Sequence, residues 1–278
     1  MKEKKTATSV NERIAKSKKS KKRNQFQSVM LSVSSIALFI LIWEMLVVFQ
    51  IVPSHYLAKP EEILRLFAVK LTDPNPDGAV LGRNILSSLQ VSAIGFVLAV
   101  CIGVPLGWLM GWYRTIGSIV TPIFEIIRPI PPVAWIPLMI VWVGVGLKAK
   151  VIIIFLSALI PCVINAGMGM KQTSQVLINV GKTCGASNFV LFYKVGIPSA
   201  LTMTFTGVKV AIGNAWATLV AAEMLAASSG LGYMILQGRN FGRTDIIMLG
   251  VVLIGGIGTI IISLFSHVEG LLFGWKKR

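Results

Sequence analysis

Long apolar stretches alternate with short polar ones along this chain. Most of the apolar stretches are about 20 residues or longer, which is the length of helix that crosses a bilayer core. The strict alternation of membrane β-strands is absent. The pattern therefore predicts an all-α polytopic membrane protein with about six transmembrane helices. We place them over residues 30–52, 86–112, a proline-broken region from 116, 151–170, 200–225 and 246–273.

Composition and charge support a membrane protein. The 278 residues are 54% hydrophobic and 14% charged, against about 25% charged in soluble domains. A net charge of +16 can indicate nucleic acid, but ten of the 27 Lys and Arg lie within residues 1–28. Basic flanks stay on the cytoplasmic side. We predict a multi-pass membrane protein with both termini cytoplasmic and no nucleic-acid partner.

The chain divides into a basic N-terminal segment and a transmembrane domain. Residues 1–28 form a basic head that we expect to be disordered and to rest on anionic membrane lipid, and residues 29–278 form the transmembrane domain. Lys276, Lys277 and Arg278 close the chain on the same side of the membrane.

A polar module, residues 171–198, separates the fourth and fifth apolar stretches. It carries two short apolar-periodic pieces around Gly185-Ala186-Ser187 and ends at Ile197-Pro198. The span count places it on the cytoplasmic face, where we interpret it as a helical module that contacts another molecule. Residues 181–183 resemble the end of a phosphate-binding loop, but Val176 stands where that motif needs glycine and no strand precedes it.

A proline-rich break interrupts the third apolar stretch. Prolines remove backbone donors, and the carbonyls they free at membrane depth need a partner or a water-lined cavity. The break therefore lines a translocation pathway or is a kink in a packed helix. Its residues include Arg128, Pro129, Pro131, Pro132, Trp135 and Pro137. Glu125 can pair with Arg128 one turn away, in a structural or a transport role.

Polar residues in the fifth stretch are further pathway candidates. Lys209 and Asn214 face a cavity, or else serve helix packing or reach the lipid interface. Glu223 lies near the outer end of this stretch, before glycines that imply a tight turn or a simple interfacial loop. An ionisable residue within a membrane span is a functional candidate by default.

Small residues and reactive side chains complete the pattern. Gly103, Gly107 and Gly111, spaced by four, predict close approach of another helix. His55 and His267 are isolated, and the three cysteines lack metal-ligand spacing, so we expect free thiols and no metal site. No catalytic set is recognisable, and we predict a chain that is not an enzyme.

Three stretches together resemble the permease subunits of binding-protein-dependent ABC importers, most closely the nitrate, sulfonate, taurine and bicarbonate group. They are residues 128–144, the polar module, and residues 221–233, and the resemblance covers residues 38–273. The family module reads Glu-Ala-Ala, three residues, Gly, and about a dozen residues to Ile-Pro or Leu-Pro. Gly185, Ile197 and Pro198 match this pattern. Asn179-Val180-Gly181 departs from it, and the missing acid puts one polar contact to the ATPase in doubt.

The resemblance implies a type I importer permease fold, in the bacterial plasma (inner) membrane, in which two copies form the pore. The module would dock on a separate ATP-binding subunit that carries ATP and Mg, and this chain would hold no cofactor. A substrate-binding protein outside the membrane would deliver a small anion such as a sulfonate, taurine or nitrate. The residues implied in coupling are Asn179, Val180, Gly181, Gly185, Ala186, Ser187, Ile197 and Pro198. Gly185 would allow close approach of the two helices of the module, and Pro198 would fix the angle at which the chain re-enters the membrane as the fifth span.

An ion- or proton-coupled secondary carrier is the alternative function. Such carriers often show paired broken helices in internal repeats, and we find no second copy of the proline-rich break. An intramembrane enzyme is disfavoured by the missing catalytic residues.

Overall fold

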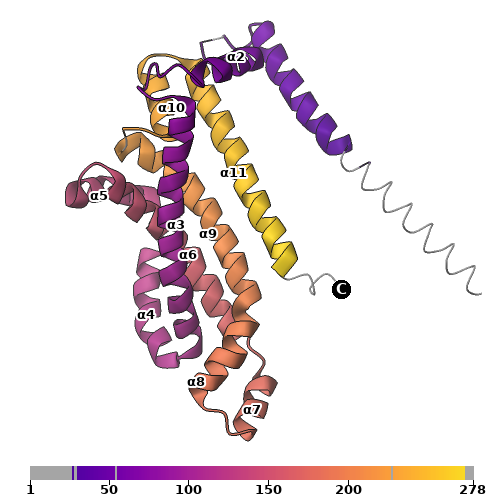
Figure 1. Ribbon diagram of the computed structural model, residues 1–278, viewed down its shortest axis with the longest axis vertical. Helices are drawn as coiled ribbons and strands as arrows, with labels where there is room; N and C mark the ends of the chain where they lie inside the picture. The colour runs from indigo at the N-terminus through magenta and orange to yellow at the C-terminus, as the bar shows by residue number, and fades with distance from the viewer. Residues whose placement is uncertain (1–26, 28–29, 54, 227, 273–278) are drawn as a thin grey trace, which may run out of the picture. The chain divides into compact units, whose positions relative to one another are not determined.

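The computed structural model describes residues 27, 30–53, 55–226 and 228–272, which form helices joined by turns, with no strand among them (Figure 1). The all-α prediction is confirmed. Almost all of the predicted basic head, and the three basic residues at the C-terminus, lie outside the described residues. The chain forms two compact units, Met1–Leu64 and Arg65–Arg278, which are described separately.

The first unit contains a long apolar helix, Met30–Val48. Nearly all of its apolar side chains are exposed, as expected for a helix that meets lipid. The Trp43 indole N–H donates to the Ala58 carbonyl at 3.1 Å and ties the following turn to the helix. Helix α2 (Pro60–Lys70) begins in this unit, with Glu61 and Glu62 in its first turn, where acids offset the helix dipole.

Five helices in the described ranges are long and apolar enough to cross a membrane. A sixth span results if α4 and the following helices, which bend by 82°, cross as one, so the predicted count is confirmed. The spans are Met30–Val48, α3 (Leu81–Trp112), α4 (Arg114–Ile127) with η1 (Pro132–Trp135) and α5 (Ile136–Val143), α6 (Leu147–Lys171), a helix over Asn188–Leu225 that contains most of α9 (Ile197–Ala226), and α11 (Thr244–Leu272).

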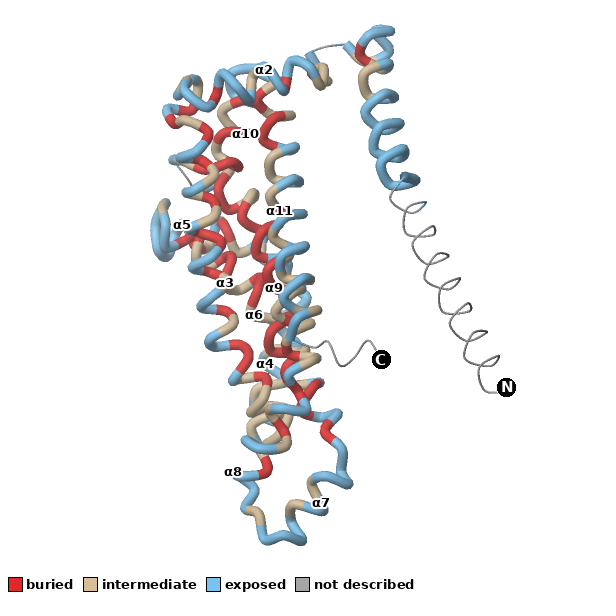
Figure 2. The backbone as a smooth tube through the Cα atoms, turned by 45° about the vertical axis from the view of Figure 1, so that its right-hand side comes forward, coloured by how far each residue is buried: buried red, intermediate tan, exposed pale blue. Residues whose placement is uncertain are grey.

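Helix α6 packs between α3 and α9 and forms the core of the second unit (Figures 1 and 2). The face of α3 toward α6 is built from glycine. A Cβ on Gly103 would lie 2.9 Å from that of Cys162, and one on Gly111 would lie 2.5 Å from the Gly167 carbonyl oxygen. Apolar burial drives little association between helices in lipid, so close backbone packing supplies the attraction. The predicted close approach at this stripe is confirmed.

The second unit has two different ends. At one end the chain after α6 forms α7 (Gln175–Thr183), α8 (Asn188–Leu191) and a π-helical turn, η2 (Phe192–Gly196), before α9. At the opposite end α10 (Leu231–Asn240) joins α9 to α11 (Figure 1). Buried residues follow α3, α6 and α9, whereas α7 is largely exposed (Figure 2).

Candidate functional site

The polar module folds as the helix–turn–helix that its sequence predicts. Gly185 has a φ of 77° and ends α7. Its N–H donates to the Lys182 carbonyl at 2.9 Å, and the Ala186 N–H donates to the Gly181 carbonyl at 3.0 Å. This pair of bonds is the Schellman helix end, which favours glycine because an L side chain strains a left-handed backbone. The Ser187 hydroxyl then accepts from the Val190 N–H at 3.4 Å and caps α8.

The close contact between the two helices lies at Gly181. A Cβ on Gly185 would have no neighbour within 4 Å, so the prediction that this glycine allows close helix approach is wrong. A Cβ on Gly181 would run into the Leu191 side chain, which is 2% exposed. Gly181 therefore lets α7 rest on α8, and Gly185 serves the turn.

Aromatic side chains fix the module to the end of α3. The Phe192 ring lies 5.9 Å from the Trp112 ring and 5.7 Å from the Tyr113 ring, measured between centroids. The Trp112 indole N–H donates to the Asn188 side-chain oxygen at 3.2 Å. Gly196 leaves room for this packing, because a Cβ there would lie 2.8 Å from the Trp112 ring. Helix α8 is therefore packed against the end of α3 and continuous with α9.

Pro198 follows the π-helical turn at the start of α9. It has no N–H to donate to the carbonyl of Lys194 four residues earlier, which fits the wider hydrogen-bond spacing of the preceding turn. The helix continues through this bulge from Asn188 to Leu225. The bulge, rather than a loop, joins the module to the membrane span.

The outer face of α7 exposes three apolar side chains among polar ones. Val176, Leu177 and Val180 are 69%, 52% and 56% exposed, and these positions lie on one side of a helix. Phe189 and Tyr193 are exposed on the adjoining helix. The module contains lysines but no Asp or Glu. An apolar patch with a polar rim is typical of a protein docking surface.

Replacing Gly185 by alanine should destabilise the end of α7 by about 1–2 kcal/mol, the cost of an L residue in the left-handed conformation. Amide hydrogen exchange should then speed up in residues 175–187. Gly82→Ala is the matched control, because Gly82 has helical geometry and open space around its Cβ position. Equal exchange in the two variants would contradict the role assigned to the turn.

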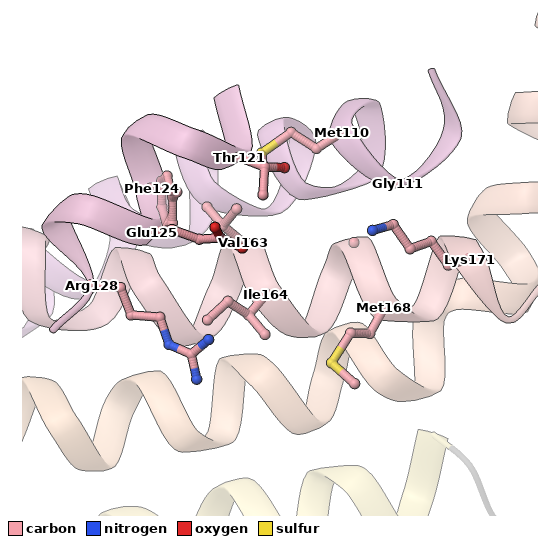
Figure 3. Close-up of a pocket in the computed structure, with 11 residues that line it drawn as sticks. Met110, Gly111, Thr121, Phe124, Glu125, Arg128, Val163, Ile164, Met168 and Lys171 are labelled. Atoms are coloured by element: carbon pink, nitrogen blue, oxygen red, sulfur yellow. The ribbon is translucent and has the colours of Figure 1, made fainter. Parts of the chain in front are cut away.

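A pocket of about 230 Å³ lies between α3, α4 and α6 (Figure 3). Its charged lining residues are Glu125, Arg128 and Lys171, with the Thr121 hydroxyl beside them. No ion pair among the described residues joins Glu125 to Arg128, so the predicted pairing is wrong. The two cationic side chains therefore remain available to an anion. Lys171 is a lining residue that the sequence did not reveal as a candidate.

The proline-rich break begins where it was predicted. Helix α4 ends at Ile127, and η1 starts at Pro132. Trp135 packs against a buried cluster that includes Ile136 and Met139, whereas Pro129, Pro131 and Pro137 are exposed on this chain. The prolines are thus free to contact a second copy of the chain or to line a translocation pathway. That they line a pathway stays a prediction.

The candidates on α9 lie outside this pocket. The Lys209 ammonium is 3.2 Å from a carboxylate oxygen of Glu269 on α11, and both side chains are 32% exposed. This geometry matches the helix-packing alternative for Lys209. Asn214 is exposed, and its backbone carbonyl accepts a bond from Ser157 on α6 at 3.2 Å.

The Lys209–Glu269 pair should contribute about 1 kcal/mol, because half-exposed ion pairs are weak. We expect Lys209→Gln and Glu269→Gln each to lower the melting temperature slightly. The charge-swapped Lys209→Glu/Glu269→Lys variant should recover most of the loss. A swapped variant that is less stable than both single variants would argue against a simple ion pair.

Glu223 is fully buried at the α10 end of the unit. Its carboxylate accepts from the Ser88 hydroxyl at 2.8 and 2.9 Å and from the Gly232 N–H at 2.9 Å. The Ser88 oxygen in turn accepts from the Leu231 N–H at 2.9 Å. The carboxylate therefore fixes the glycine-containing turn to α3 and α9. Lys150 is also buried, in α6, and attracts Glu223 electrostatically.

The buried hydrogen bonds continue along α3. The Gly230 N–H donates to the Asn84 side-chain oxygen at 3.0 Å, and the Asn84 amide donates to Asp77 at 2.6 Å. Asp77 pairs with Lys70, which is also buried. Asn84 and Ser88, one turn apart in an apolar helix, were the available sequence signal for this network. It links α2, α3, α9 and α10.

Comparison with known proteins gives a consistent set of relatives. Residues 103–269 match the family model described as the binding-protein-dependent transport system inner membrane component. A putative ABC transporter permease protein of Methanocaldococcus jannaschii is 35% identical over 90% of this chain and 94% of its own length. The taurine transport system permease protein TauC of Escherichia coli is 34% identical over 82% of this chain and 83% of its own.

Two further comparisons extend this set. The nitrate import permease protein NrtB of Synechocystis is 30% identical over 88% of this chain and 89% of its own length. Among solved structures, an inward facing conformation of the MetNI methionine ABC transporter matches 66% of this chain and 95% of its own, with a TM-score of 0.52 and 22% identity. That likeness shows a shared fold.

Proposed function

This chain belongs to the family of binding-protein-dependent transport system inner membrane components, and from that premise we propose that it is the pore-forming subunit of an ATP-driven importer for a small anion. The observation that carries the proposal is the apolar face of α7. This face lies at the end of the bundle, on the helix–turn–helix that α7 and α8 form. Gly181 lets α7 pack on α8, and the contact between the Phe192 and Trp112 rings attaches this module to α3. A separate ATP-binding subunit, holding ATP and Mg, would dock there.

The geometry supports a direct mechanical coupling. Closure of the ATP-binding subunits would displace α7, and its contact with Leu191 would carry the displacement to α8. The continuous helix from Asn188 to Leu225 would extend it into the membrane. A pathway between two copies of the chain would then change the side to which it opens.

An anionic substrate fits the charges near the break in the third span. Arg128 and Lys171 line one pocket and form no ion pair with Glu125. The names of the relatives TauC and NrtB refer to taurine and nitrate. We therefore propose taurine, another small sulfonate or nitrate as the substrate, delivered by a binding protein outside the membrane.

The second copy of the chain would cover surfaces that one copy leaves open. The exposed prolines of the break and Asn214 are such surfaces, and we place them along the pathway of a homodimer. Both termini would be cytoplasmic, which puts the α7 end on the side where ATP is available.

Uptake in proteoliposomes tests the proposal. The chain would be reconstituted with its ATP-binding subunit and binding protein, and labelled taurine and nitrate would be offered separately. We expect uptake of one of them to require ATP on the α7 side and to be unaffected by a proton gradient. Uptake that persists without ATP when a proton gradient is imposed would indicate a secondary carrier instead.

A further inference from the structure

We propose that the hollow behind α7 is a binding site for an oxyanion group, a sulfate or phosphate that is either free or part of an acidic lipid headgroup. This hollow, the α7 pocket, has a volume of about 380 Å³. It lies between the end of α3, the end of α6, α7 and the start of α8. Lys171, Lys182, Thr173, Gln175, Asn188 and Trp112 line it. It adjoins the pocket of Figure 3, and Gly111 and Lys171 line both.

The charge in the α7 pocket is all of one sign. Lys171 and Lys182 are its charged lining residues, and no Asp or Glu lines it. Neither lysine takes part in the ion pairs found in the described part of the chain. Arg114 lines an adjoining hollow together with Lys171. Charge-assisted hydrogen bonds from such groups are the strong ones that hold sulfate and phosphate.

Neutral donors complete the lining. The Asn188 side-chain oxygen is occupied by the Trp112 indole N–H, so its amide N–H groups remain available to a ligand. Thr173 is 5% exposed, and its hydroxyl has no hydrogen-bond partner among the residues described. A buried polar group without a partner is unusual in a folded protein and needs an explanation. A bound oxyanion supplies one.

The start of α7 adds a further attraction. Its N-cap residue, Ser174, makes no side-chain cap, and Gln175 in the first turn lines the pocket. The start of this nine-residue helix therefore lies beside the hollow, where the positive end of the helix dipole favours an anion. The lysines, the hydroxyl and the helix start thus converge on one ligand chemistry.

The site leaves the proposed docking face free. Gln175, Ile178 and Lys182 follow one another at helical spacing and line the pocket, whereas Val176 and Val180 are exposed to solvent. A bound oxyanion would tie the start of α7 to α6 and α8 from behind. Binding is measured independently of transport, so the inference does not depend on the proposed function.

The test is a binding titration of the full chain purified in detergent. Sodium sulfate would be titrated at constant ionic strength with chloride, and the melting temperature would report binding. In parallel, nanodiscs of phosphatidylcholine would be compared with nanodiscs that also contain phosphatidylglycerol. Protection by sulfate in detergent indicates a free oxyanion, and protection only by phosphatidylglycerol indicates a lipid phosphate. Protection by neither overturns the proposal.

Variants assign the effect to the α7 pocket. Lys182→Gln, which leaves the pocket of Figure 3 intact, should weaken the protecting interaction by about tenfold or more, because a charge-assisted bond is lost. Thr173→Val should weaken it less while leaving the unliganded chain as stable as before, since its hydroxyl has no protein partner. Lys194→Gln is the control, because Lys194 is exposed on the same module and does not line the pocket. Unchanged protection in Lys182→Gln, or equal loss in the control, would refute the site.

Discussion

Replacing Glu223 with alanine should remove most of the folded protein from the membrane. The substitution leaves the Ser88 hydroxyl and the Gly232 N–H without the carboxylate that accepts from both. It also leaves Lys150 buried beside a neutral residue. Unpaired buried charges and donors of this kind cost roughly 3–5 kcal/mol, which is comparable with the stability of many domains. The amount of monodisperse protein after detergent extraction measures the effect.

Two further variants separate the contributions. Glu223→Gln keeps the shape of the side chain but turns one acceptor into a donor, so it should be intermediate. Glu269→Gln, at the half-exposed ion pair, should behave almost as the parent chain. A Glu223→Ala variant that extracts and melts like the parent would show that the turn at Gly230–Gly232 does not need the carboxylate.

Replacing Val180 with aspartate should abolish ATP-driven uptake while the chain still folds. Val180 is exposed on the apolar face of α7, so the folded monomer loses no packing there. In the docked complex the new carboxylate would be taken out of water without a partner. Losses of this kind amount to several kcal/mol, which weakens docking by more than about a hundredfold. Uptake and co-purification of the ATP-binding subunit are the measurements.

Asn179→Asp is the matched control for this prediction. It adds the same charge one residue earlier, at the position where the family pattern has glutamate, and it should leave uptake unchanged or raise it. Equal uptake in the parent and in Val180→Asp would show that the apolar face does not contact the ATP-binding subunit. Loss of uptake in both variants would point to added negative charge, rather than to the position, as the cause.

The membrane helices could be predicted because bilayer thickness imposes a minimum length on each apolar stretch, and that length can be counted in the sequence. The same holds for Gly103, Gly107 and Gly111, whose spacing of four already defines a helix face. The break after Ile127 was visible because proline cannot continue a hydrogen-bonded helix. Each of these features depends on residues close together in the chain.

Features that depend on distant residues were not visible in the sequence. The steric role assigned to Gly185 belongs to Gly181, because only the folded module shows that Leu191 packs over α7. Glu223 was recognised as unusual, but its partner Ser88 lies 135 residues away. Likewise the residues that line the α7 pocket come from α3, α6, α7 and α8, and no single motif contains them.

Docking of an ATP-binding subunit on the apolar face of α7, as we propose, can be tested directly. A cysteine at Val180, in a chain whose own three cysteines have been replaced, tests it by cross-linking in the reconstituted complex. A second cysteine, at the exposed Phe241 that follows α10, serves as the control, because α10 lies at the opposite end of the unit from α7 (Figure 1). We expect cross-linking to the ATP-binding subunit from position 180, with a yield that changes on addition of ATP, and none from position 241. No cross-link from position 180, or equal yields from the two positions, would contradict it.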